Sequence, residues 1–205
     1  MRGRAFIFAA VVLGACTYRT EVPPVDGSSL AGVGAQQPGH YAALVHTGGW
    51  NMTVEITGSK CSLNTYEADL NPVWDQAMRG ALSAALEKVD FVSDALPGTE
   101  LVKRGYDAEI GVTQSNASIR MGVVSHFLTG EAISETSLDG ILTISYPDGS
   151  LQQQPIHGQS TAKQEGFTCG DVGPAVANSG ASAVRDIVER TTTATKLLLV
   201  QRSPR

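Results

Sequence analysis

Three cysteines carry the most distinctive chemistry of this 205-residue chain. The first, Cys16, follows the small residues Gly14 and Ala15, and two arginines among the first four residues precede an apolar run over residues 5–13. A charged start, a short apolar core and small residues before a cut are typical of a secretory signal peptide. The run is far shorter than the about 20 residues with which a helix crosses a bilayer. The sequence therefore predicts a signal peptide over residues 1–15.

The tetrapeptide Leu-Gly-Ala-Cys that ends at Cys16 resembles the bacterial lipobox. This resemblance implies that the thiol receives a diacylglyceryl group, that the chain is cut before the cysteine, and that the new amino terminus is acylated again, for example with palmitate. Two or three acyl chains, at about 0.8 kcal/mol per buried methylene, anchor a protein without a spanning helix. The alternative is an ordinary signal cut at Ala15 that leaves a free thiol. We expect acylated Cys16 to bind the lipid bilayer.

The other two cysteines, Cys61 and Cys169, are predicted to pair with each other. If Cys16 is lipidated, they are the two thiols left in an oxidising compartment, and only one intramolecular pairing exists. Each precedes a predicted helix, and two helices that start at the same end of a sheet would bring the thiols together. We expect a structural disulfide; two separate buried thiols are the alternative.

A Ser-x-x-Lys pattern at Ser160 and Lys163 matches the nucleophile motif of penicillin-binding enzymes. In those enzymes a helix N-terminus presents the serine beside the basic lysine. Here the motif lies at the end of a predicted strand, and the Lys-Thr-Gly element that accompanies it in those enzymes is absent from the sequence. We therefore interpret it as a surface loop.

The histidines do not have the spacing of a metal site. None of the four stands at i, i+4 or in a His-x-His pattern, and no cluster of carboxylates accompanies them: His40, His46, His126 and His157. Zinc needs three or four converging ligands. A Gly-x-Ser-x-Gly nucleophile elbow is also absent. We expect no catalytic residues, no metal and no cofactor, and hence a protein that is not an enzyme.

The charge balance excludes several classes of partner. The chain has 15 basic and 20 acidic residues, and loss of the signal peptide removes two of the arginines. A nucleic-acid binder would need clustered lysine and arginine to displace counterions from phosphates. A polybasic patch for anionic lipid is also missing, so the acyl chains must do the anchoring. We expect no nucleic-acid partner.

Two regions follow the signal peptide. Residues 16–39 contain Pro23-Pro24 and several glycines without apolar periodicity, which is typical of a flexible tether. A loop packed onto the domain is the alternative. Residues 40–205, roughly 165 residues, are long enough for a single periplasmic domain with its own core. Thr17 stands where enteric lipoproteins kept in the inner membrane carry aspartate, and this resemblance favours the outer membrane.

Two helices are predicted in this domain. The first begins at Asn71, a good N-cap followed by Pro72, and its apolar face recurs at three- and four-residue spacing as far as Val89. The second begins near Gly173 and buries a stripe that continues toward Leu198. Residues 196–200 fit a strand equally well.

Strands fill the rest of the domain. Two short β-favourable runs, residues 41–47 and 52–57, flank Gly48-Gly49 and indicate strands joined by a tight turn. Strict alternation over residues 110–127 and 138–146 indicates half-buried antiparallel strands.

A turn at residues 146–150 leads into a final polar strand, Leu151 to Ser160. This strand contains Pro155, which cannot donate to a ladder, and it is therefore predicted at a sheet edge. Its three glutamines, Gln152, Gln153 and Gln154, add side-chain hydrogen bonding without like-charge repulsion. We expect this edge to accept a partner strand. The alternative is that Pro155 and the polar faces prevent association.

The element order predicts an α+β fold with two helices on one face of a small antiparallel or mixed sheet of about four to six strands. The order, the lipobox and the acidic body resemble the YajG-type lipoproteins and, more loosely, the lipopolysaccharide-assembly lipoprotein. These families imply a non-enzymatic envelope component, sometimes bound to an outer-membrane β-barrel. No motif beyond the lipobox matches, so no functional residues are carried over.

These observations lead to a ranked set of functions. The first is a lipid-anchored scaffold or assembly accessory that faces the periplasm and acts through contacts with an envelope protein. The second is an accessory of lipid or glycan transport to the outer membrane. An anchored hydrolase ranks last, because it would need titratable groups that converge in one cleft.

Substitution of the lipobox cysteine tests the membrane attachment. Cys16→Ser should give a protein without acyl chains that no longer fractionates with membranes, because the thiol that accepts the diacylglyceryl group is gone. Intact mass and membrane fractionation check this. Unchanged mass and undiminished retention in the variant would contradict it.

Overall fold

A meander of three long antiparallel strands is the largest feature of the computed structural model, which describes residues 17–31, 34–57, 61, 64–125, 130–166 and 169–202. The strands are β7 (Ala108–Ser125), β8 (Gly130–Ser145) and β9 (Leu151–Glu165). β8 lies between the other two and pairs with both over nearly its whole length. Such long strands are possible because alternate residues are apolar and face one side.

Further strands extend the meander into a six-stranded sheet of order β6-β2-β7-β8-β9, with β4 also paired to β7. They are β2 (Gln37–Val45), β4 (Glu55–Thr57) and β6 (Leu86–Phe91). β2 runs parallel to both of its neighbours. A smaller sheet has the order β1-β5-β3 and consists of β1 (Thr17–Thr20), β3 (Asn51–Thr53) and β5 (Thr65–Asp69).

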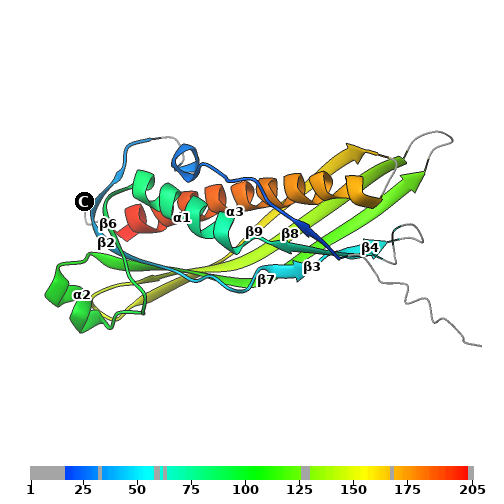
Figure 1. The fold of residues 1–205 in the computed structure, drawn as a ribbon. Helices are drawn as coiled ribbons and strands as arrows, with labels where there is room; N and C mark the ends of the chain where they lie inside the picture. Colours follow the sequence, from blue (N-terminus) through cyan, green and yellow to red (C-terminus); the bar gives the residue numbers. More distant parts are fainter. Residues whose placement is uncertain are drawn as a thin grey trace, which may run out of the picture.

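Two helices cover one face of the six-stranded sheet, α1 (Asn71–Ala85) and α3 (Gly173–Arg202) (Figure 1). The short helix α2 (Gly98–Arg104) lies apart from them, and the 3₁₀ turns η1 (Gly27–Leu30) and η2 (Cys169–Val172) complete the fold. The core lies between sheet and helices and includes fully buried Trp74, Met78, Leu82, Val184, Ile187, Ile110, Leu142 and Ile144. The predicted α+β class, with two helices on one face, is confirmed.

The threonine run at residues 191–193 is helical, and α3 continues through residues 196–200, which fitted a strand equally well, to Arg202. The hydroxyl of Thr191 donates to the carbonyl of Ile187 at 2.6 Å, and that of Thr192 to Val188 at 2.7 Å. Since each buried hydroxyl is satisfied by the preceding turn, the run costs little in this helix. No helix within the described ranges is long and apolar enough to cross a membrane.

Some predicted element boundaries were wrong. α1 ends at Ala85, and the residues that continued its apolar spacing form β6 instead. Gly48-Gly49 does not join a hairpin, because β2 pairs with β6 and β7 whereas β3 pairs with β5. The reason is burial: residues 41–45 are all buried, as expected of a central parallel strand.

Residues 17–31 do not form the predicted tether, and the alternative of a segment packed onto the domain describes them. β1 pairs in parallel with β5, and Val25 and Leu30 are 3% and 7% exposed. Gly27 lies so close to α1 that a Cβ there would stand 1.9 Å from the carbonyl oxygen of Ala77. Burial of these apolar side chains offsets the entropy of ordering a glycine- and proline-rich segment.

Cys61 and Cys169 form a disulfide with a Cα–Cα distance of 5.5 Å. It links the segment before β5 to the turn before α3, and the hydroxyl of Tyr66 also donates to the carbonyl oxygen of Cys169 at 2.5 Å. Cys16 and the predicted signal peptide lie outside the described residues.

The close approach of β9 to α3 gives a stability prediction. A Cβ at Gly158 would lie 2.6 Å from Cβ of Ile187 and 2.9 Å from the carbonyl oxygen of Ala183. Gly158→Ala must push α3 from the sheet and should lower the free energy of unfolding by about 1–3 kcal/mol. Gly111→Ala is the matched control, because a Cβ there meets Thr143 at an ordinary 3.6 Å. Equal urea midpoints for the two oxidised variants would contradict the prediction.

Candidate partner-binding site

The three predicted glutamines lie on β9, which is an edge of the six-stranded sheet, as predicted. Their side chains divide between the two faces. Gln152 is half-buried and its Oε1 accepts a hydrogen bond from the hydroxyl of Tyr146 at 3.1 Å. Gln154 lines a groove between β9 and α3. Gln153 is exposed on the opposite face, 3.5 Å from Oγ1 of Thr143.

The direction of the backbone groups along β9 follows from three hydrogen bonds. The pairs Tyr146–Ser150 and Gly130–Gly166, at the two ends of the β8–β9 ladder, are hydrogen-bonded. By the alternation of an antiparallel ladder, even-numbered residues of β9 bond to β8 and odd-numbered residues direct their N–H and C=O groups to the free edge. The N–H of Gln159 agrees, since it donates to Oδ2 of Asp186 on α3 at 3.1 Å.

This register explains why Pro155 is tolerated. Pro155 stands opposite Ile141 in a position that directs its backbone away from β8, so its missing N–H removes no ladder bond. On the same edge, Gln153 and His157 direct their N–H groups outward. Neither N–H has a hydrogen-bond partner among the described residues. A segment of open edge therefore runs from Leu151 to His157.

The open edge ends where α3 crosses it. Asp186 caps Gln159, and beyond it the groove between β9 and α3 is lined by His157, Glu189, Arg190 and Leu197. Arg190 is held by Asp186, with Nε 2.8 Å from Oδ1. A carboxylate that occupies an edge N–H blocks strand addition at that point, as a covering helix does. The edge is thus protected at Gln159 and open toward the glutamines.

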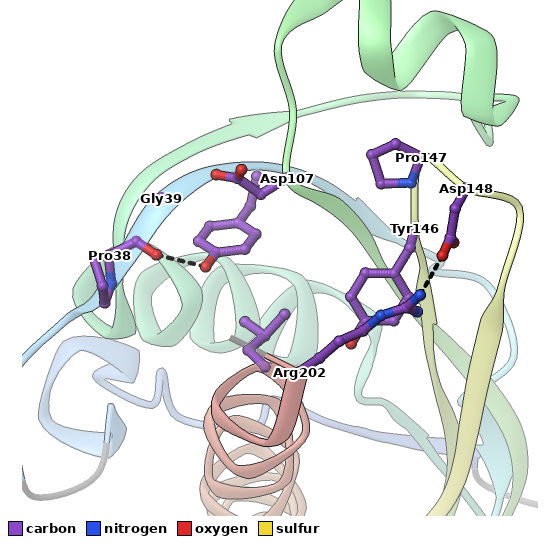
Figure 2. Close-up of a pocket in the computed structure, with 9 residues that line it drawn as sticks. Pro38, Gly39, Asp107, Tyr146, Pro147, Asp148 and Arg202 are labelled. Atoms are coloured by element: carbon purple, nitrogen blue, oxygen red, sulfur yellow. Dashed lines mark hydrogen bonds and ion pairs between the residues drawn. The ribbon is translucent and has the colours of Figure 1, made fainter. Parts of the chain in front are cut away.

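A hollow of about 580 Å³ lies beside the start of this edge, where α3 ends and β8 turns into β9 (Figure 2). Its walls come from residues far apart in the sequence: Pro38, Gly39, Tyr41, Asp107, Tyr146, Pro147, Asp148, Leu199 and Arg202. The hydroxyl of Tyr41 donates to the carbonyl of Pro38 at 2.7 Å, and burial raises the pKa of this tyrosine.

Arg202 fastens the end of α3 to the turn. Its guanidinium stacks over the ring of Tyr146 at 4.0 Å, pairs with Asp148 and donates to the hydroxyl of Ser150. Hydrogen bonds from Ser150, and then the charge of Arg202, hold the pKa of Asp148 below its ordinary value. A cation at the last turn of a helix is also favoured by the helix dipole. The hollow therefore has fixed walls beside the open edge.

The other residues considered as catalytic or metal-binding candidates lie apart from one another. Ser160 and Lys163 do not form the predicted surface loop, because both pair with β8 within strand β9, and Lys163 also pairs with Glu131 at 3.4 Å. Among the described histidines, His40 bonds to Asp90 at 2.7 Å, and the carbonyl of His46 accepts from Nε1 of Trp74. His126 lies outside the described residues. In the part of the chain that the structure describes, no three His, Cys, Asp or Glu side chains could hold a metal ion.

The hollow and α2 were not predicted. The sequence contained a signal for α2: Glu100 in the first turn, Lys103 and Arg104 in the last, and Gly105 with φ of 70° as its C-cap. The hollow had none beyond its turn at residues 146–150, because its walls meet only through the tertiary packing of α3 and β2.

Comparison with known proteins shows a similarity of fold alone. The sequence matches no protein-family model and no curated protein. The structure is similar to that of a Xanthomonas campestris protein of the DUF330 family, with a TM-score of 0.52 at 10% identity over 92% of this chain and 98% of that chain.

Two further structures are similar at lower scores. One is a neuraminyllactose-binding hemagglutinin homolog from Helicobacter pylori, with a TM-score of 0.49, 14% identity and coverage of 82% of this chain and 90% of that one. The other is a minor lipoprotein from Acinetobacter baumannii, with a TM-score of 0.41, 9% identity and coverage of 77% and 91%.

The exposed edge contains a group that titrates near neutrality. Nδ1 of His157 lies 2.8 Å from Oδ1 of Asp139, and this hydrogen bond raises the pKa of the histidine above its ordinary 6.5. The stabilisation that the charged histidine gains from this contact is therefore fully present below its unfolded pKa of about 6.5 and is lost as pH rises through the folded pKa. NMR titration should show that Asp139→Asn lowers the pKa of His157, whereas Asp148→Asn leaves it unchanged. Equal values in all three proteins would contradict the assignment.

Proposed function

We propose that this protein is a lipid-anchored lipoprotein on the periplasmic side of the bacterial outer membrane, where it acts as a non-enzymatic scaffold or assembly accessory of an envelope complex. The lipobox before Cys16 supports the anchor. The observation that carries the scaffold role is the open β9 edge from Leu151 to His157. A partner would add an extended segment to this edge as a further strand.

The chemistry of the edge suits such a partner. Backbone groups at an edge supply affinity, and side chains at alternate positions supply specificity. Gln153 and Gln154 present amides to either face without the charge that normally blocks pairing. The adjoining hollow, with Tyr146 and Pro147 in its wall, would take a side chain of the same partner. Its carboxylates, Asp107 and Asp148, oppose an anionic lipid head.

A backbone-specific substitution tests the proposal in cells. A photocrosslinking residue at Gln154 should capture one discrete envelope protein. Gln153→Pro should abolish that capture, because it removes an outward N–H without removing a ladder bond to β8. Gln153→Ala is the matched control, since it removes the side chain, keeps the N–H and should retain capture.

Two crosslinking results would contradict the proposal. The proposal is wrong if the residue at Gln154 gives only monomer while a probe at Arg185, an exposed residue of α3 that does not line the groove, captures a partner. The binding surface would then be the helical layer, and the polar edge would serve to prevent association. Loss of capture with Gln153→Ala but not Gln153→Pro would also exclude strand addition.

A further inference from the structure

The cysteine predicted to be lipidated is attached directly to the folded body. Thr17, the next residue, is already part of β1 and pairs with Thr65 of β5. Consecutive Cα atoms are about 3.8 Å apart, so the lipidated residue lies within a few ångströms of Thr17. No flexible spacer separates the acyl chains from the domain.

β1 is held firmly to the domain, so an anchor attached beside Thr17 restricts the orientation of the whole body. Tyr18 stacks on Tyr66 with ring centroids 5.1 Å apart, and Nε of Arg19 lies 3.3 Å from Oε2 of Glu67. The same Tyr66 bonds to the carbonyl of Cys169, which is disulfide-linked to Cys61. Pairing, stacking and the disulfide thus tie the start of the mature chain to the start of α3.

The domain has two distinct ends along α3. The disulfide end holds Thr17, the disulfide, and the tips of β7, β8 and β9 near Ser125, Gly130 and Glu165. Figure 1 shows the start of α3 and the tips of the three long strands at the same end of the molecule. The turn end holds residues 146–150, the glutamines and Arg202. The 30 residues of α3 span about 45 Å between them.

We infer that the lipid anchor seats the disulfide end against the bilayer and directs the turn end, with its hollow and open edge, about 45 Å into the periplasm. The inference rests on the proposed lipidation of Cys16. The surface of the protein that contacts the membrane is the disulfide end, and it contacts the layer of lipid headgroups beside the acyl chains.

Charge does not produce this orientation. At the disulfide end Glu131 stands directly opposite Glu165 across the β8–β9 pair, and Lys163 is already paired with Glu131. Among the described residues, these carboxylates at the strand tips do not attract anionic lipid. The orientation comes from the short covalent connection, so it should not change with salt or with the fraction of anionic lipid.

Energy transfer from the protein to acceptor lipids tests the orientation. The mature chain, expressed from Cys16, is coupled through this thiol to a maleimide phospholipid and bound to phosphatidylcholine vesicles that contain an acceptor lipid. A fluorescent amino acid is placed at Lys163, near the disulfide end, or at Gln153, near the turn end. Transfer from Lys163 should be at least about twofold more efficient, given the length of α3.

A linker variant is the matched control. About twenty Gly and Ser residues between Cys16 and Thr17 give a coil of roughly 25 Å, which should remove most of the difference between the two positions. Equal transfer from the two positions without the linker would overturn the inference. Chemical coupling makes this result independent of natural lipidation, whose failure would show separately as an unacylated mass in the cell-derived protein.

Discussion

The contact between β9 and α3 is the constraint on which the rest of the structure depends. The long meander presents one apolar face, which is stable only if it is covered along its length. α3 covers it because Gly158 lets the helix backbone reach the sheet at Ile187. α1 then packs beside α3, and the N-terminal segment lies on α1 through a second close approach at Gly27. The packing of α1 thus depends on α3, and the packing of the N-terminal segment depends on α1.

The same contact divides the sheet edge into a closed part and an open part. Where α3 lies against β9, Asp186 takes up the N–H of Gln159 and closes the edge. Toward the turn, Pro155 and Gln153 direct their backbones outward. An edge that is capped at Gln159 and open from Leu151 to His157 can select a short extended segment without inviting unlimited strand addition. A helix that packs for stability therefore also defines the surface available to a partner.

Local patterns in the sequence predicted much of the fold, because alternation and helical spacing record which face is buried. The meander, α1, α3 and the edge position of β9 follow from such patterns. The strand at residues 41–45 was also predicted, but its parallel pairing with β6 and β7 was not. β6 was assigned to α1, because Leu86 and Val89 continue the apolar spacing of that helix. The packing of residues 17–31 could not be predicted from local patterns either. Isolated apolar residues such as Val25 also occur in flexible linkers, and only their tertiary contacts show that they are buried. The hollow depends on contacts such as that of Arg202 with Tyr146, which no local pattern encodes.

The disulfide strengthens the connection between the small N-terminal sheet and the core. β1 has only four residues, and such short pairing would resist little if the anchor were pulled. The disulfide spans 108 residues, and closing a loop of that size stabilises the folded state by about 4–5 kcal/mol in the chain-entropy model. It also links the small sheet, through η2, to the start of α3, the element that covers the core. Force on the start of β1 would pass to β5 through hydrogen bonds and the Tyr18–Tyr66 stack, and from the segment before β5 to α3 through the disulfide. The short strand and the disulfide thus act in series to hold residues 17–20 to the helix that covers the core.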